Sequence, residues 1–301
     1  MKIGDRIGNI RIVKRLGQGG MGEVFEGFDE RLLRRVAVKA LNPGSFASED
    51  SRARFLREAQ VLSRLDHANI CRIHGLEETP ENDFLILELL EGRTLSEIPQ
   101  EDLSREERLR CAQGIAEALH AAHQEGIIHR DLKPENVMVV GADRVKVLDF
   151  GIARLLDQPI EVDDKDLTQG PASTPSPSST PTEVIRRPAT GSERLTASWT
   201  ASSSSGAALT KQGFLVGTPA YMSPEQAGGA ELTQASDLYS LGILLQELFS
   251  GSPAYDPAPT PVARIVQVAE GDSRPMEDGD PAVVQLIKDL KSLDPADRPT
   301  A

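Results

Sequence analysis

The chain has 301 residues, 39% of them hydrophobic and 26% charged, which is enough apolar material for the core of a globular protein. Its formal net charge of -13 argues against nucleic-acid binding, because a phosphate backbone requires clustered Lys and Arg, and the two cysteines, Cys71 and Cys111, indicate neither a disulfide framework nor a zinc site. No stretch is apolar enough to span a membrane and none resembles a signal peptide, so we expect residues 1–301 to be cytoplasmic, with an anchor beyond Ala301 left open.

The first ninety residues are predicted to be mostly strands. Hydrophobic and polar side chains alternate in several short runs, as they do where a strand is buried on one face. The strands expected on this basis are residues 10–16, 24–27, 35–41, 70–74 and 84–90. Between them, residues 52–65 place Ala59, Leu62 and Leu65 on one stripe, which predicts a helix.

Beyond Gly92 the pattern becomes mostly helical. Apolar side chains recur at steps of three and four in residues 105–125 and again in residues 235–249, which predicts two long helices. We therefore expect an α+β protein in which a small β-rich part precedes a larger α-helical part.

One segment departs from this pattern. Residues 168–210 contain 18 Ser or Thr and five Pro among 43 residues, with few large apolar side chains. Such a composition cannot bury enough surface to offset the entropy of ordering the chain. We predict a disordered insertion over residues 163–213; an alternative is that it is a spacer without a role of its own.

A glycine-rich sequence lies between the first two predicted strands. It matches GxGxxG and consists of Gly17, Gln18, Gly19, Gly20, Met21 and Gly22. A dinucleotide-binding fingerprint would have to open a helix, whereas the residues that follow here are strand-like. A loop between two strands can fold its backbone over phosphates, although a flexible hairpin would have the same sequence features.

Lys39 and Glu58 form a candidate ion pair. Lys39 ends a predicted strand, where a lysine is often simply solvated. Glu58 interrupts the apolar stripe of the predicted helix, and a buried carboxylate requires a cation. The pair would hold Lys39 toward the α- and β-phosphates of a nucleotide, unless Glu58 turns out to solvent.

The strongest signal is a pair of motifs typical of phosphoryl transfer. This reaction needs a base for the incoming hydroxyl, oxygen ligands for Mg²⁺ and a cation near the γ-phosphate. Asp131 can act as the base, Lys133 can reach the transferring phosphoryl, and Asn136 and Asp149 offer metal oxygens. The motifs are His129-Arg130-Asp131-Leu132-Lys133-Pro134-Glu135-Asn136 and Asp149-Phe150-Gly151.

With these motifs, residues 8–160 and 213–301 resemble the eukaryotic-like serine/threonine protein kinases of bacteria. The resemblance implies the bilobal protein kinase fold, with an N-lobe over residues 1–91, a C-lobe over residues 92–301, and ATP with Mg²⁺ or Mn²⁺ in the cleft between them. The sequence ends where the family begins its last helix, so we expect a truncated last helix.

The resemblance also assigns roles to residues of the cleft. The backbone of Glu88 and Leu90 would bind adenine, with Val24 and Ala37 above the base and Met138 below it. An internal hydrophobic spine would consist of Leu62, Ile73, His129 and Phe150. These apolar positions are also what any core would contain, so they predict the fold more than the function.

The same resemblance concerns the substrate and its control. Thr218 would contact the catalytic loop in a segment that receives Ser or Thr substrates, Glu225 would pair with Arg298, and Asp237 would brace the catalytic loop. Arg130 would pair with a phosphate on the activation segment. We hypothesise that this phosphate is carried by Thr210.

The predicted function is that of a non-specific serine/threonine protein kinase in bacterial signalling. It would transfer the γ-phosphate of ATP to proteins and phosphorylate its own activation segment, with self-association as one route to that reaction. Two other classes compete with this hypothesis. A pseudokinase would usually lack Lys39, Asp131 or Asp149, and a small-molecule phosphotransferase would lack the docking segment at 217–225.

Overall fold

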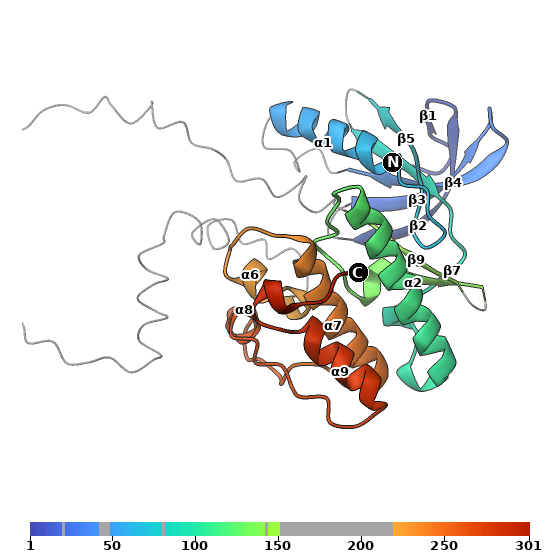
Figure 1. The fold of residues 1–301 in the computed structure, drawn as a ribbon. Coiled ribbons are helices and arrows are strands. Elements are labelled where there is room, and N and C mark those ends of the chain that lie inside the picture. Colours follow the sequence, from blue (N-terminus) through green and yellow to red (C-terminus); the bar gives the residue numbers. More distant parts are fainter. Residues whose placement is uncertain (20–21, 42–48, 80–81, 142–143, 151–218) are drawn as a thin grey trace, which may run out of the picture. The chain divides into compact units, whose positions relative to one another are not determined.

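The computed structural model describes residues 1–19, 22–41, 49–79, 82–141, 144–150 and 219–301, which all belong to one compact unit (Figure 1). The predicted insertion at 163–213, and Thr210 within it, lie outside the described residues. No helix in the described ranges is both long enough and apolar enough to cross a membrane.

The strand-rich part is a six-stranded antiparallel sheet with the order β1-β2-β3-β4-β6-β5. The strands are β1 (Arg6–Ile7), β2 (Ile10–Gly19), β3 (Gly22–Asp29), β4 (Arg34–Ala40), β5 (Ile73–Glu78) and β6 (Asp83–Glu88). Alternation along β4 and its neighbours sends Ile12, Val36 and Val38 into a core where each is completely buried. Helix α1 (Glu49–Leu62) lies beside this sheet and contacts β5 (Figure 1).

A small second sheet begins the helical part. It has the order β7-β8-β9 and consists of β7 (Gly92–Thr94), β8 (Val137–Val140) and β9 (Arg144–Val147). Short 3₁₀ helices lie at Leu95–Glu97, Gln100–Asp102 and Pro134–Asn136. The last of these leads directly into β8, so the catalytic motif predicted from the sequence ends where the central strand of this sheet begins.

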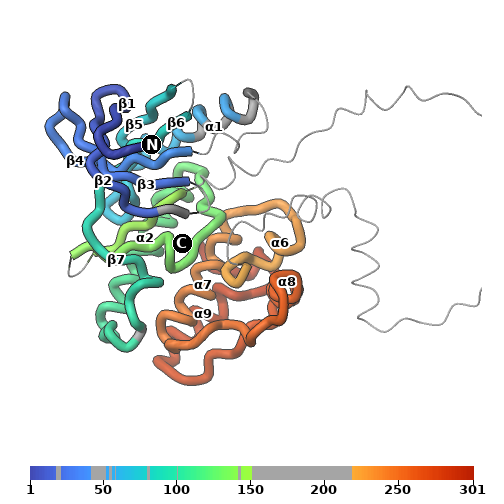
Figure 2. The backbone as a smooth tube through the Cα atoms, turned by 180° about the vertical axis from the view of Figure 1, so that it is seen from behind, coloured from blue at the N-terminus to red at the C-terminus, as the bar shows by residue number. Residues whose placement is uncertain are grey.

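Two long helices form the centre of the helical part. They are α2 (Arg105–Gln124) and α7 (Gln234–Ser250), and α7 packs against both α2 and α9 (Pro281–Leu290), as Figure 2 shows. The side chain of Ser104 caps the start of α2, and Gly251 ends α7 in the left-handed conformation that glycine adopts without strain. Shorter elements complete the helical part: a 3₁₀ turn at Pro219–Tyr221, α6 (Pro224–Ala227), α8 (Pro261–Ala269), α9 (Pro281–Leu290) and a 3₁₀ turn at Pro295–Asp297.

One hydrophobic core joins the two parts. It contains Leu62 and Leu85 from the strand-rich part together with Ile115, Leu119 and Leu244 from the helical part, all of them buried. The α+β class and the order of a small strand-rich part before a larger helical one are therefore confirmed.

One predicted strand is displaced. Residues 70–74 were expected to form a single strand, but β5 begins only at Ile73. Ile70 instead forms a parallel bridge with Val147, and the Cys71 amide donates to the Val147 carbonyl at 2.9 Å. Ile70 thus pairs with β9, which is distant in the sequence, and does not form part of β5.

Candidate active site

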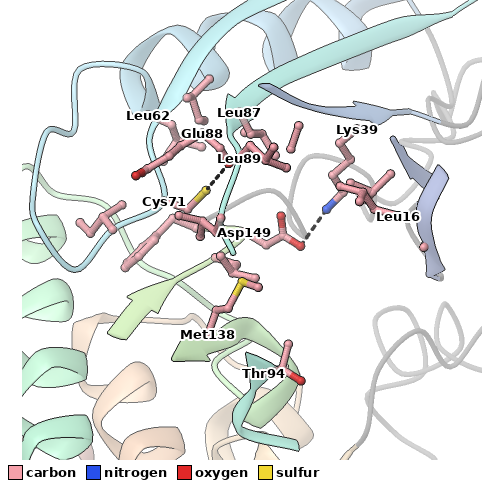
Figure 3. Close-up of a pocket in the computed structure, with 18 of the residues that line it drawn as sticks. Leu16, Lys39, Leu62, Cys71, Leu87, Glu88, Leu89, Thr94, Met138 and Asp149 are labelled. Atoms are coloured by element: carbon pink, nitrogen blue, oxygen red, sulfur yellow. Dashed lines mark hydrogen bonds and ion pairs between the residues drawn. The ribbon is translucent and has the colours of Figure 1, made fainter. Parts of the chain in front are cut away.

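Lys39 and Asp149 form an ion pair at one end of a cavity. Strand β4 carries Lys39, whose side chain is buried, and its Nζ lies 2.8 Å from Oδ2 of Asp149, as Figure 3 shows. Asp149 follows β9 and has a φ of 58°, which is unusual for a residue with a side chain. The pair joins the strand-rich part to the motif around Asp149, and the carboxylate contributes negative charge where a metal ion is expected.

The catalytic motif folds back on itself around Asp131. Pro134 occupies the first position of the 3₁₀ helix, where a missing amide hydrogen costs nothing, and Lys133 precedes it. The Lys133 Nζ lies 2.6 Å from Oδ2 of Asp131, and the Asn136 amide nitrogen donates to the Asp131 carbonyl (2.7 Å) and carboxylate (3.2 Å). The predicted base, cation and amide are therefore brought together.

Asp237 supports this loop from α7. Its carboxylate accepts hydrogen bonds from the backbone amides of His129 and Arg130, both at 2.8 Å, and from the His123 ring at 2.8 Å. Asp237 is almost completely buried, so these donors replace the water that a carboxylate otherwise requires. The expected brace of the catalytic loop is present.

The predicted spine residues lie in one core. The His129 and Phe150 rings pack at 4.6 Å, and the His129 Nε2 lies 2.9 Å from the Leu148 carbonyl oxygen. Leu62 and Ile73 belong to the same hydrophobic cluster. Through these two contacts His129 holds Leu148 and Phe150, the residues on either side of Asp149.

The cavity has a volume of about 300 Å³ and a mostly apolar lining. Its lining includes the residues expected around adenine, namely Val24, Ala37, Glu88, Leu90 and Met138, and also Gly17 of the glycine-rich sequence and the charged pair of Lys39 and Asp149 (Figure 3). A cavity with an apolar body and a few converging charges suits a ligand that has a flat base and a charged tail.

Cys71 also lines the cavity, and the sequence pattern did not mark it. Burial, together with the nearby charges of Glu88 and Asp149, raises the pKa of the Cys71 thiol to about 12. The thiol therefore stays protonated at neutral pH and acts as part of the apolar wall.

The two strands expected on either side of the glycine-rich loop are present. Gly19 and Gly22 are paired at the ends of β2 and β3, and Gly22 has a φ of 135°, which only glycine adopts readily. Gly20, Met21 and Thr218 lie outside the described residues, as do the side chains of Gln18 and Glu58. The predicted pair of Lys39 with Glu58 thus stays a prediction.

The predicted partner of Glu225 is Arg298, and the structure contains this ion pair. The two side chains meet at 2.7 and 3.0 Å, and Ser236 donates a further hydrogen bond to Glu225 at 2.7 Å. Burial opposes ionisation of Glu225, but the hydrogen bonds from Arg298 and Ser236 outweigh it and lower the pKa of this carboxyl. The pair ties α6 to the end of the chain.

Lys146 is a second residue of the site that sequence reasoning missed. Its Nζ lies 2.8 Å from the Glu88 carboxylate and 3.1 Å from the Ile70 carbonyl oxygen. Lys146 precedes the Asp149 motif by three residues, but a lysine in a strand is common, and only the fold reveals its partner.

The donor set fits a hard divalent cation. Asp149 supplies a carboxylate, and Asn136 uses its amide nitrogen on Asp131, which leaves its carbonyl oxygen for a metal. Oxygen ligands of this kind are the ones that Mg²⁺ and Mn²⁺ prefer.

Comparison with known proteins identifies relatives over most of the chain. The family model described as "Protein kinase domain" matches residues 10–175 and 200–301. The chain is 32% identical to serine/threonine-protein kinase pkn2 of Myxococcus xanthus over 97% of its own length and 31% of the relative's. It is 33% identical to a probable serine/threonine-protein kinase PknB of Lactococcus lactis, over 82% of this chain and 32% of that protein.

A solved structure has the same fold. The kinase domain of Mycobacterium tuberculosis PknI, in a mutant form, superimposes with a TM-score of 0.61 at 24% identity, covering 99% of this chain and 93% of that one. The predicted bilobal kinase fold is therefore confirmed. The chain spans about a third of the length of pkn2 and about half that of pkn3, which is also from Myxococcus xanthus.

Proposed function

The chain belongs to the protein kinase domain family, and we propose that it transfers the γ-phosphate of ATP to Ser or Thr hydroxyls of proteins in bacterial signalling. The single observation that carries this proposal is the cluster in which the side chains of Lys133 and Asn136 both lie within hydrogen-bond distance of the Asp131 carboxylate. This cluster lies in the same compact unit as the cavity that ends at Lys39 and Asp149.

The chemistry follows from these groups. The hydroxyl oxygen of the substrate attacks the γ-phosphorus, the bond from that phosphorus to the β,γ-bridging oxygen breaks, and ADP leaves with the bonding electrons. Asp131 would accept the hydroxyl proton, and Lys133 would stabilise the negative charge on the transferring group. Asn136 and Asp149 would hold Mg²⁺, which neutralises phosphate charge when bound, and Lys39 would orient the α- and β-phosphates.

The protein substrate is the second part of the proposal. It is supported by the segment that includes Glu225, because the ion pair with Arg298 anchors the segment that is expected to dock a peptide and that small-molecule phosphotransferases lack. The names of the relatives point to Ser and Thr as acceptors. The chain itself is a further candidate substrate, by association of two copies, although Thr210 lies outside the described residues.

We expect the purified chain to transfer labelled phosphate from ATP to a generic basic protein, and Asp131→Asn to lower kcat by at least about 100-fold because the base is lost. Lys39→Met should abolish transfer as well. Lys288→Met, which changes an exposed lysine on α9, is the matched control and should keep full activity.

Folding and ATP binding of each variant are checked by thermal melting and by nucleotide titration. A wild-type chain that folds and binds ATP but transfers no phosphate to protein would instead be a nucleotide-binding scaffold. Transfer to small hydroxylated compounds alone would identify a small-molecule phosphotransferase.

A further inference from the structure

Arg130, the residue before the proposed base Asp131, has a strained backbone. Its φ is 70°, in the left-handed region that residues with a Cβ avoid. Such a conformation persists only where the surroundings hold it, and it is typically found where a functional group must be aimed. The groups that hold Arg130 therefore influence the direction of Asp131.

Both amide groups that flank Arg130 are held by side chains. The Arg130 amide nitrogen donates to Oδ1 of Asp237 at 2.8 Å. On the other side, the Arg130 carbonyl oxygen accepts a hydrogen bond from Nε2 of Gln226 at 3.0 Å. That carbonyl belongs to the peptide bond that joins Arg130 to Asp131, and the Asp131 amide nitrogen of the same bond donates to Nδ1 of His129 at 3.3 Å, so α6 and His129 together hold its plane.

Helix α6 is itself firmly anchored. The backbone amide of Gln226 donates to Oγ of Ser223, the residue that caps the helix, at 3.2 Å. The preceding residue, Glu225, forms the buried ion pair with Arg298. Because α6 has only four residues, these contacts rather than helix propagation hold Gln226 in place.

We propose that Gln226 is a positioning residue for phosphoryl transfer. Its amide couples the docking helix α6 to the Arg130–Asp131 peptide and keeps the Asp131 carboxylate directed toward the substrate hydroxyl. This inference rests on the proposed kinase function. It implies that the proton acceptor is aligned only when α6 is docked, so that substrate recognition and catalysis depend on the same element.

The first test is Gln226→Ala. We expect kcat to fall by about tenfold, the change that corresponds to one lost hydrogen bond in the transition state, while KM for ATP stays unchanged. Thermal melting should move little, because the freed carbonyl of the half-buried Arg130 can be hydrated. The matched control is Gln234→Ala, since the Gln234 amide likewise donates to a backbone carbonyl, that of His123, at 2.7 Å.

A second variant separates positioning from packing. In Gln226→Glu a carboxylate faces the Arg130 carbonyl and repels it, whereas the protonated acid can donate the missing hydrogen bond. The ratio of kcat for Gln226→Glu to kcat for Gln226→Ala should therefore rise as the pH is lowered from about 7 to about 4, through the usual range of a glutamate. Dividing the two rates cancels the effects of pH that both variants share.

The outcomes are distinct. A kcat for Gln226→Ala within twofold of wild type, a loss equal to that of Gln234→Ala, or a pH-independent ratio overturns the role of Gln226. A wild-type chain without transfer activity overturns the proposed function instead.

Discussion

In the part of the chain that the structure describes, three residues other than glycine have a positive φ. Arg130 and Asp149 belong to the candidate active site, where strain is retained because the surrounding contacts direct a functional group. Leu33 (φ 51°) is different: it lies in the turn between β3 and β4, its side chain is 76% exposed, and it contributes neither to the core nor to the cavity.

We therefore predict that Leu33→Gly stabilises the protein by about 0.5–1 kcal/mol, because the left-handed penalty is larger than the entropy that glycine adds to the unfolded chain. The measurement is the free energy of unfolding in urea. Leu32→Gly is the control: Leu32 is also exposed but is not among the residues with positive φ, so glycine there should be destabilising. Equal effects at the two positions would contradict the argument.

The candidate active-site residues that could be predicted from the sequence are those whose spacing is itself the signal. Asp131, Lys133 and Asn136 lie within six residues, so their approach depends only on a local loop. Gln226 and Lys146 could not be predicted in this way. Their partners Arg130 and Glu88 are 96 and 58 residues away, and the contacts exist only in the folded chain.

At the scale of elements, helix prediction depended on length and on end signals. The predictions for α2 and α7 came within one residue of each end, because both helices are long and periodic. The short helices α8 and α9 were not assigned, although each has Pro at its start and a capping side chain, Thr260 or Asp280. End signals of this kind indicate a short helix where periodicity is too brief to be seen.

Lys291, which follows the last residue of α9, is a partly buried charged residue that contacts α7. Its Nζ donates to the Gln246 side chain on α7 and lies 3.5 Å from the Arg274 carbonyl oxygen. Space for it exists because residue 242 is glycine: a Cβ there would lie 2.9 Å from Cγ of Lys291. Burial lowers the pKa of Lys291 from 10.5 to about 8.

This pKa predicts how the free energy of unfolding depends on pH. Between about pH 8 and the unfolded value, the unfolded chain binds more protons at this position than the folded chain, so Lys291 makes stability rise with pH in that window. The stability of wild type relative to Lys291→Met should therefore increase from about pH 7 to about pH 10, measured by urea unfolding. Lys288→Met on the same helix controls for general effects of lysine loss, and a pH-independent difference for Lys291→Met would disprove the prediction.

At the scale of the whole molecule, the strand-rich and helical parts are joined beside the cavity. Residues 69–71 pair with β9, since the Val147 amide donates to the Asn69 carbonyl at 2.7 Å. Gly114 on α2 allows this close approach, because a Cβ there would collide with the Val145 side chain and lie 2.8 Å from the Asn69 side chain. Lys146, half-buried next to this junction, then reaches the Glu88 carboxylate on the strand that is proposed to bind adenine.

Lys146 thereby links the proposed adenine end of the cavity to the strand that leads to Asp149. The Lys146 and Glu88 side chains are 13% and 32% exposed, so water screens the pair only partly. If the Lys146–Glu88 ion pair sets the separation between the adenine and the phosphates of bound ATP, its loss should weaken ATP binding more than it slows the chemical step.

We expect Lys146→Met and Glu88→Gln each to raise KM for ATP by about fivefold, corresponding to about 1 kcal/mol, with kcat nearly unchanged. In the double variant the two effects should not add, because either substitution alone already removes the interaction. The control cycle uses Lys14 and Glu26, a Lys–Glu ion pair that does not line the cavity, and it should leave KM unaltered. Additive effects of Lys146→Met and Glu88→Gln would mean that the two side chains act on the nucleotide independently.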